Sequence, residues 1–300
     1  MLLENYDKCA LLLPFNGVNN GISFPDYGIY NTDFSVFGDA KTVTAQSKYY
    51  GSSGYFDGNG DYLQAGYNPN IVINGTDDFT FSIWYYPTTN AIDQTLYTSG
   101  EPDATAGTQI GISIAYFGSS LSGKLRCFFY NSSTQYGVDT LSALTLNAWN
   151  HIGFTRKSGT IYLGLNGVIQ SSLSANVSIN NSLNFVHRIA RYTDSIPRFL
   201  NGYLADLAFV KGVGLWDSNY TVPAALTGEI SGNVKDAAAA NASRIITACP
   251  RTNPTRAFST VSDAGTGNYT LRVPSTEVSR IALADEGTLY NDIVDRIIPA

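Results

Sequence analysis

Apolar and polar residues alternate over short stretches throughout the first 222 residues of the chain, and this period is that of β-strands. In Phe79–Pro87 one set of alternate residues is wholly apolar, and the opposite set ends in aromatic residues. This pattern fits a strand in a sandwich with a covered inner face. The same period predicts further strands over residues 110–117, 124–130, 149–156 and 202–210.

Turn signals separate these runs. Asn166-Gly167 stands between the apolar runs 161–165 and 168–170, and this dipeptide favours a two-residue hairpin because both central positions need positive φ. Long stretches with helical spacing are absent from the sequence. Many short strands with regular turns predict an all-β sandwich or jelly roll.

The pattern restarts after residues 222–228, which predicts a boundary between a first domain, 1–225, and a second domain, 226–300. Residues 229–235 alternate cleanly between apolar and polar side chains. Further strands are predicted over residues 244–249, 257–262, 269–273, 278–284 and 293–298. About 75 residues suffice for a small immunoglobulin-like sandwich.

Composition strengthens the all-β prediction and excludes one class of partner. Tyr (20) and Gly (28) are abundant and charged residues make up only 14%, a mixture that suits pleated strands with tight turns. The formal charge of −6 argues against nucleic-acid binding, which relies on clustered Lys and Arg. Cys9, Cys127 and Cys249 lack a metal-ligand spacing, so we expect reduced, partly buried thiols.

An apolar patch near the start, residues 10–13, is short and lacks a basic segment before it. It predicts a strand rather than a signal peptide. No stretch approaches the roughly 20 apolar residues of a membrane span. We therefore expect synthesis in the cytoplasm without a signal peptide, and no membrane insertion.

Four motifs follow one another in the first three quarters of the chain: Gly54–Leu63, Trp149–Arg156, Tyr162–Gly167 and Asn201–Leu207. In this order they resemble the central hairpin, the strand that begins with Trp, the following hairpin and the final strand of the laminin-G-like, concanavalin A-type jelly-roll family. The resemblance implies a laminin-G-like jelly-roll sandwich over residues 1–225.

A finer resemblance involves Gln46–Tyr49, Lys211–Trp216 and Asn219–Pro223. These segments are similar to the version of the family found in tailed-phage and prophage proteins. In the second domain, the pattern Ile230, Gly232, Val234, Asp236 and the set Asp263, Gly267, Tyr269, Leu271 resemble carboxypeptidase-regulatory-like sandwiches. This resemblance implies an immunoglobulin/transthyretin-like β-sandwich over residues 226–300.

The phage-type resemblance implies a non-enzymatic protein on the surface of a bacteriophage particle, as a capsid decoration, head fibre or tail-associated protein. Its partners would be other virion proteins and copies of itself, and it would be made in the bacterial cytoplasm. The alternative is a tail fibre or adhesin that binds host-surface glycans. A glycoside hydrolase is the third reading.

Catalytic residues are not evident in the sequence. Glycosidases need two carboxylates that flank the scissile bond, and Glu101-Pro102-Asp103 is the nearest approach to such a pair. The chain has only two histidines, His151 and His187, and lacks the G-x-S-x-G elbow of serine hydrolases. We predict packed histidines and no catalytic residue.

Two kinds of binding site are candidates. Asp57, Asn59 and Asp61 alternate as oxygen ligands do at the start of a calcium loop, but the rest of that loop's pattern fails, and a tight hairpin turn is the alternative. Calcium is thus the only cofactor we consider. For sugars, which stack on exposed aromatic rings, the candidates are loop aromatics, namely Tyr116, Tyr136 and Tyr192.

Overall fold

The computed structural model of the 300-residue chain describes residues 5, 8–73, 75–105, 107–223, 228–233, 240, 245–250, 258–261, 263–273, 279–284 and 293–297. The chain divides into two compact units, Met1–Pro223 and Ala224–Ala300. The sequence predicts this division after Ala225. The described residues include no helix that is long and apolar enough to cross a membrane.

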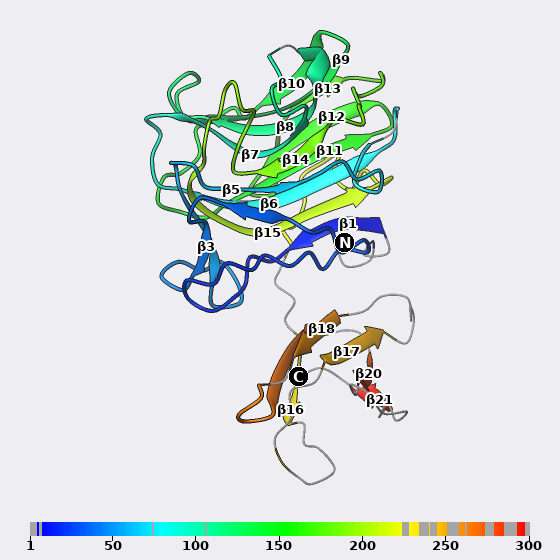
Figure 1. The fold of residues 1–300 in the computed structure, drawn as a ribbon. Coiled ribbons are helices and arrows are strands. Elements are labelled where there is room, and N and C mark those ends of the chain that lie inside the picture. Colours follow the sequence, from blue (N-terminus) through cyan, green and yellow to red (C-terminus); the bar gives the residue numbers. More distant parts are fainter. Residues whose placement is uncertain are drawn as a thin grey trace. The chain divides into compact units, whose positions relative to one another are not determined.

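The first unit is a sandwich of two antiparallel sheets (Figure 1). The larger sheet has eight strands. Seven of them follow one another in the order β13 (Val168–Ser174), β12 (Thr160–Leu165), β11 (Asn150–Lys157), β6 (Phe79–Pro87), β15 (Asn201–Lys211), β4 (Ser53–Asp57) and β3 (Lys41–Val43). The eighth strand, β1 (Cys9–Leu13), pairs with the second half of β15.

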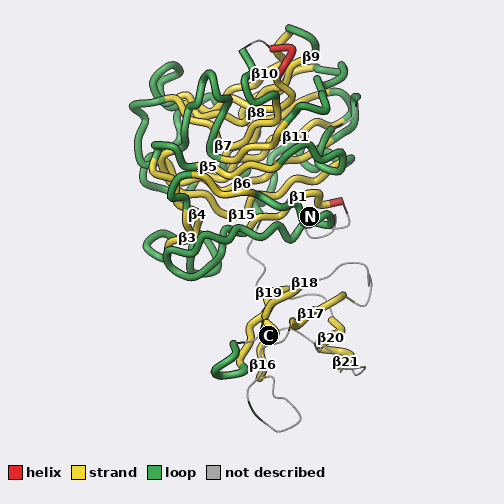
Figure 2. The backbone as a smooth tube through the Cα atoms, viewed as in Figure 1, coloured by secondary structure: helices red, strands yellow, loops and turns green. Residues whose placement is uncertain are grey.

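The second sheet of this unit has seven strands, and the loops that join the two sheets run around its rim (Figure 2). A short 3₁₀ turn, η2 (Gly107–Gln109), precedes one of its central strands. The order of the strands is β10 (Thr134–Asp139), β9 (Lys124–Asn131), β8 (Ile110–Phe117), β7 (Asp93–Gly100), β14 (Val186–Ile189), β5 (Tyr62–Ala65) and β2 (Ser35–Phe37).

Alternate residues of both sheets meet in one hydrophobic core. In β6 the apolar set that the sequence predicts is buried in this core, and the ring of Phe81 stacks on that of Phe209 in β15 at 4.3 Å. Full burial of each such side chain contributes roughly 1.5–3 kcal/mol to folding. The all-β jelly-roll prediction is therefore confirmed, with the core between the two sheets.

The predicted hairpin at Asn166-Gly167 joins β12 and β13. The φ angles of the two residues are 51° and 87°, both positive as the turn requires. A Cβ on Gly167 would lie 2.4 Å from the carbonyl oxygen of Tyr220, so only glycine fits at this position.

The second unit contains two antiparallel sheets, one with β16 (Gly228–Asn233) and β19 (Asn268–Val273), the other with β18 (Phe258–Val261), β17 (Ile245–Pro250), β20 (Ser279–Ala284) and β21 (Ile293–Ile297). In the loop before β19, Asp263 accepts hydrogen bonds from the amides of Gly265 and Thr266. Val234 and Asp236 of the predicted motif lie outside the described residues. The immunoglobulin-like arrangement of this unit stays a prediction.

Candidate functional site

The outer face of the seven-stranded sheet carries aromatic and cationic side chains, as strand β9 illustrates. Alternate residues of β9 point into the core, among them Leu125, Cys127 and Phe129. The intervening residues Arg126, Phe128 and Tyr130 belong to the outer face. Aromatic and cationic side chains therefore occupy positions where a solvated strand normally carries small polar residues.

The segment 190–199 lies against this outer face. Its backbone is tied down at several points: the amide of Thr95 in β7 donates to the carbonyl of Arg198 (3.1 Å), and the amide of Asp194 donates to that of Pro102 (2.7 Å). Within the segment, the Tyr192 amide donates to the carbonyl of Pro197 (2.9 Å). These bonds hold the side chains of this segment beside those of β8 and β9.

A hollow of about 320 Å³ opens between this segment, the loop before β8 and the outer face of the sheet. Small-molecule sites usually measure about 300–1,000 Å³, so the hollow is at the small end of that range. Most of its lining residues are aromatic or apolar, but several of these are buried, and the surface that faces the hollow is mainly polar. The lining residues are Ala104, Thr105, Gly107, Ile110, Phe117, Arg126, Phe128, Tyr130, Gln135, Tyr192, Ile196 and Arg198.

Two guanidinium groups converge on one ring in this hollow. The Cζ atoms of Arg126 and Arg198 lie 5.7 and 5.1 Å from the centre of the Phe117 ring, within the range of cation–π contacts. Arg126 donates to both carboxylate oxygens of Asp139, at 2.6 and 2.7 Å. These bonds raise the pKa of Arg126 and fix its position.

Arg198 has a different environment. Its guanidinium also lies over the ring of Tyr192 (5.3 Å to the centre), and it makes no ion pair within the described part of the chain. Burial raises the pKa of the nearby Asp93, but hydrogen bonds from Ser120 and Ser119 and the charge of Arg198 outweigh it, so this pKa lies below its usual value. The charge of Arg198 thus lowers the pKa of Asp93, although the two side chains form no ion pair.

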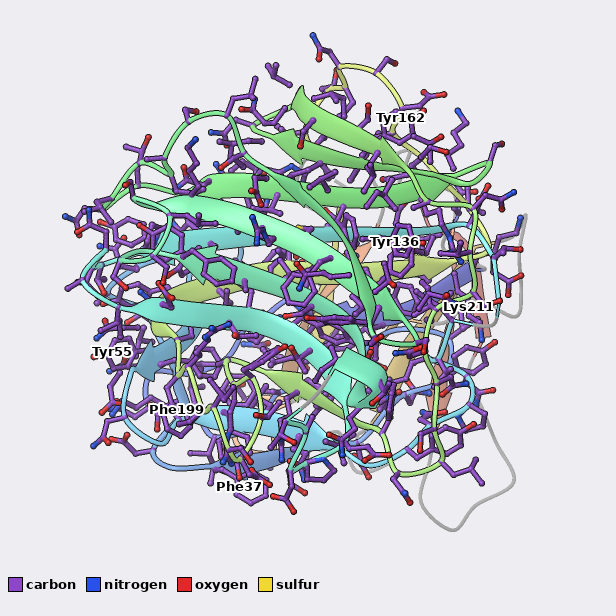
Figure 3. The ribbon with its side chains drawn as sticks, turned by 90° about the horizontal axis from the view of Figure 1, so that it is seen from above. Phe37, Tyr55, Tyr136, Tyr162, Phe199 and Lys211 are labelled. Atoms are coloured by element: carbon purple, nitrogen blue, oxygen red, sulfur yellow. The ribbon has the colours of Figure 1, made fainter. Side chains whose placement is uncertain are left out.

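A second aromatic group, which we call the aromatic edge, consists of Phe37, Tyr62, Phe199 and Arg191. Phe37 stacks on Tyr62 at 4.4 Å, Tyr62 lies 6.3 Å from Phe199, and Arg191 lies 4.6 Å over Tyr62. Figure 3 shows Phe37 and Phe199 at the same end of the molecule, away from Tyr136. The outer face therefore carries arginine–aromatic contacts at two places.

Arg188 of β14 connects these two places. Its side chain is only 3% exposed and it donates to Gln64 (2.7 Å), to Asp194 (2.9 Å) and to the carbonyl oxygens of Pro102 and Tyr192. Asp194 also pairs with Arg191 at 2.5 Å. Burial lowers the pKa of Arg188, and the charge of Asp194 opposes this shift. The network fixes the segment 190–199 on the sheet.

The three tyrosines proposed from the sequence do not form one site. Tyr116 lies in strand β8 and not in a loop, and its fully buried ring packs edge-on against Tyr85 inside the core, so it offers no face to a sugar. Tyr136 is half-buried and stacks on the core residue Phe129 at 5.5 Å. Of the three, Tyr192 is the one that lines the hollow.

Most residues of the hollow are not predicted as site residues from the sequence, among them Arg126, Arg198, Phe128, Tyr130 and Gln135. One signal was available. In residues 124–130 the set opposite the core residues contains two aromatic side chains, which is unusual for a solvated strand face.

The candidate metal ligands lie in a tight turn. Asp57 and Asp61 are close together, and the structure adds Asp39, so that one carboxylate oxygen of each lies within 4.8 Å of the others. However, the two oxygens of buried Asp61 accept the amides of Asp39 (2.7 Å) and Asp57 (3.1 Å), and the amide of Asn59 donates to Asp57 (2.7 Å).

The carboxylates of this turn already have partners. The oxygens of Asp61 already serve backbone amides, and Asp39 forms an ion pair with Lys41 at 3.3 Å. Asn59 is exposed and contributes through its backbone. The hydrogen bonds match a carboxylate that closes two turns, which was the alternative interpretation of this motif.

The candidate catalytic groups have structural partners. Glu101 accepts from Gln109 (2.9 Å) and Ser182 (3.3 Å). The ring of buried His151 bonds to Ser82 Oγ (3.0 Å) and Tyr220 Oη (3.2 Å), and burial lowers its pKa to about 3. Because Nδ1 of His151 faces a phenol instead of a carboxylate, the Ser82–His151 pair lacks the acid that orients a catalytic histidine.

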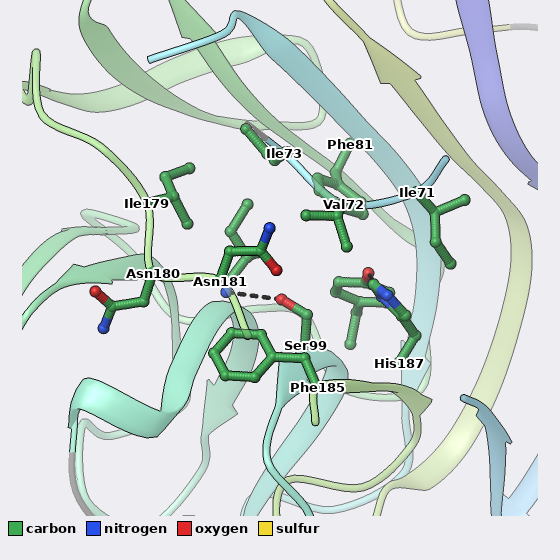
Figure 4. Close-up of a pocket in the computed structure, with 12 residues that line it drawn as sticks. Ile71, Val72, Ile73, Phe81, Ser99, Ile179, Asn180, Asn181, Phe185 and His187 are labelled. Carbon is green, nitrogen blue, oxygen red and sulfur yellow. Dashed lines mark hydrogen bonds between the residues drawn. The ribbon is translucent and has the colours of Figure 1, made fainter. Parts of the chain in front are cut away.

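His187 is also buried and neutral. Its Nδ1 bonds to the hydroxyl of Tyr97 at 2.8 Å, and burial lowers its pKa to about 3. Nε2 has no partner among the described residues. His187 borders a space of about 10 Å³ near Ser99 and Phe185 (Figure 4), which has room for a single water molecule. This space is too small for a substrate.

Two stacked antiparallel sheets with a hollow on one outer face define a lectin-like jelly roll. The chain belongs to the concanavalin A-like lectin/glucanases superfamily, whose family model matches residues 57–213. No curated protein sequence matches the chain.

Solved structures resemble it in fold. One is domain 4 of AbnA, a GH43 extracellular arabinanase from Geobacillus stearothermophilus, in complex with arabinotriose: 16% identity, TM-score 0.52, covering 69% of this chain and 94% of that domain. Another is the binding domain of botulinum neurotoxin serotype D/C. It has 14% sequence identity and a TM-score of 0.51, and the match covers 95% of this chain and 74% of that chain. A third is botulinum neurotoxin type C, whose cell entry depends on interaction with two ganglioside molecules. It has 14% sequence identity and a TM-score of 0.50, and the match covers 97% of this chain and 74% of that chain.

Proposed function

We propose that this protein is a non-enzymatic carbohydrate-binding protein and that its ligand occupies the hollow on the outer face of the seven-stranded sheet. The observation that carries the proposal is the composition of that hollow. The half-buried ring of Tyr130 supplies an apolar face on which a sugar ring can stack, and Tyr192 lines the hollow beside it. Gln135 and the two arginines supply convergent hydrogen-bond donors around them.

Similar structures support a role in binding. The arabinanase domain was solved with arabinotriose, and the neurotoxin domains are binding domains, one of them from a toxin that interacts with gangliosides. Two of these proteins thus bind a saccharide or a ganglioside. Because fold alone does not determine function, we infer the ligand of this chain from the residues of its own hollow.

The hollow suits binding better than hydrolysis. A glycosidase places two carboxyl groups on either side of the bond it cleaves. The described residues that line the hollow include two arginines and no Asp or Glu. Glu101, which the sequence offers as part of the nearest approach to such a pair, is engaged by Gln109 and Ser182.

The location we propose is the surface of a bacteriophage particle, where the protein would decorate the head or tail or act as a host-glycan adhesin. Support comes from the phage-type segments Gln46–Tyr49 and Lys211–Trp216. Attachment to other virion proteins and self-association belong to the same proposal. Particles assembled with and without the gene would be compared by mass spectrometry and electron microscopy, and absence of the protein from purified particles would refute this location.

Binding is tested on a glycan array that includes neutral and acidic polysaccharides, followed by calorimetry with the best ligand. We expect Tyr130→Ala to weaken binding at least tenfold, since stacking on its ring is lost. The matched control is Tyr162→Ala, because Tyr162 is also half-buried but lies in β12 of the other sheet. An array without signal at high protein concentration, or equal loss in both variants, would refute the proposal.

A further inference from the structure

We infer that the saccharide bound in the hollow is acidic, with a carboxylate that the guanidinium groups of Arg126 and Arg198 recognise. The inference rests on the proposed function and narrows its class of ligand. The two charged residues among those that line the hollow are both arginines, although the whole chain carries a formal charge of −6. Asp139 pairs with Arg126, so among the described residues the unpaired positive charge at the hollow is that of Arg198.

The geometry brings these two charges to one place. Both guanidinium groups lie within 6 Å of the centre of the Phe117 ring, one from strand β9 and one from the segment 190–199. Each guanidinium is thus held at the wall of the same hollow and can donate to a carboxylate of a bound ligand. A neutral sugar has no charged group with which to interact with them.

Each arginine retains donors for a ligand. Arg126 uses Nε and one Nη2 hydrogen on Asp139, so three of its five N–H groups remain. Arg198 makes no side-chain hydrogen bond or ion pair in the described part of the chain, and its guanidinium is positioned by the rings of Phe117 and Tyr192. Guanidinium groups bind carboxylates in a planar, bidentate geometry.

The rest of the lining suits the other parts of an acidic sugar. Half-buried Tyr130 and exposed Ile196 are apolar surfaces for the C–H face of a pyranose ring, and the amide of Gln135, which donates to Tyr130 Oη at 2.8 Å, borders the same space. A volume of about 320 Å³ limits recognition to a short stretch of the saccharide. The hollow thus fits one charged residue of a longer acidic polysaccharide.

The test uses the full-length protein and pairs of ligands that differ in charge. The pairs are sialyllactose with lactose, and trigalacturonate with its methyl ester, each titrated by calorimetry at low and high NaCl. We expect one charged member to bind at least tenfold more tightly than its neutral counterpart, and salt to reduce this ratio because it screens partly exposed charges.

Variants assign the preference to the hollow. Arg198→Gln should abolish the preference for the charged member, Arg198→Lys should keep part of it, and Lys157→Gln, which removes a charge from the other sheet, should leave it unchanged. Circular dichroism and thermal melting check that each variant is folded.

Three results would overturn the inference: equal affinity for both members of each pair, binding of neutral glycans alone on the array, or an unchanged preference in Arg198→Gln. The proposed function survives each of these results, because saccharides still bind. It fails separately, when neither charged nor neutral saccharides bind.

Discussion

Both outer faces of the sandwich are rich in aromatic residues, but the chain covers them in different ways. On the eight-stranded sheet, Trp216 and Tyr220 stack on each other at 4.2 Å and lie on the cross-strand pair Gly153 and Gly164. A Cβ on either glycine would come within 2.5–2.6 Å of the Tyr220 ring or hydroxyl. The two glycines, which we call the glycine seat, form a flat surface without side chains, and the segment 213–222 covers this surface.

On the seven-stranded sheet the covering segment 190–199 is held by the polar network around Arg188, and it leaves a hollow. An aromatic residue on an outward strand position can therefore become either part of the core or part of a ligand-binding surface. What decides is how a segment distant in sequence lies over it. Stacked rings on glycines close one face, while charged side chains on rings keep the other open.

The largest expected effect comes from breaking the glycine seat. Gly153→Val should destabilise the protein by about 3 kcal/mol, because the added carbons displace the rings of Trp216 and Tyr220. Urea unfolding measures the change. Gly66→Ala is the control, since a Cβ there meets no atom within 4 Å. A loss under about 0.5 kcal/mol in Gly153→Val would show that the seat does not hold the segment.

Breaking the network around Arg188 should destabilise the protein less than Gly153→Val does, but it should weaken saccharide binding more. Arg188→Met should cost about 2 kcal/mol, because Asp194 and the carbonyls of Pro102 and Tyr192 lose a buried donor. Saccharide affinity should fall at least tenfold as Tyr192 and Arg198 move.

Urea unfolding and calorimetry on the same preparation separate these two effects. Lys157→Met, which breaks an exposed pair with Asp217, should change stability by less than about 1 kcal/mol and leave affinity intact. Unchanged affinity in Arg188→Met would show that the hollow does not depend on this network.

The sequence predicts the strands of this protein better than its candidate site, and Tyr116 and Phe117 show why. A period of two residues reveals which side chains share a face, but a shift of one residue exchanges the faces. Tyr116 points into the core, whereas its neighbour Phe117 lines the hollow. Arg198 reaches the same hollow from a loop whose path no local pattern indicates. Likewise, Asp39 joins Asp57 and Asp61 through a turn that the spacing of the motif does not contain.

A further difference between the faces concerns Asp206, which lies in a bulge of β15 on the covered sheet. Burial raises its pKa to about 7, and a hydrogen bond from Tyr50 opposes this shift. Between the unfolded value of 3.8 and about 7, the folded carboxyl binds more protons than the unfolded one, so stability falls as pH rises through this range.

Asp206→Asn removes this dependence. At pH 8 we expect the variant to exceed the wild type in stability by about 1 kcal/mol or more, and near pH 4 the difference should vanish. Comparison at each pH cancels the effect of His151 and His187, whose lowered pKa values make the wild type lose stability as pH falls below about 6.5. Asp33→Asn, an exposed position, is the control. A difference that is the same at both pH values would contradict a raised pKa for Asp206.

The smallest expected effect concerns the turn at Asp57 and Asp61. Because Asp61 already accepts two backbone amides and Asp39 pairs with Lys41, we expect the melting temperature to be the same in EDTA and in millimolar CaCl₂. A site filled at 100 times its Kd would add about 2.7 kcal/mol of stability, so a calcium site of useful affinity would raise the melting temperature measurably.

Asp61→Asn should destabilise the protein equally in both buffers, since it replaces one of the two acceptors with a donor. A calcium-dependent rise that Asp57→Asn abolishes would instead make this turn a metal site, and the hydrogen bonds of Asp61 would then be part of its coordination shell.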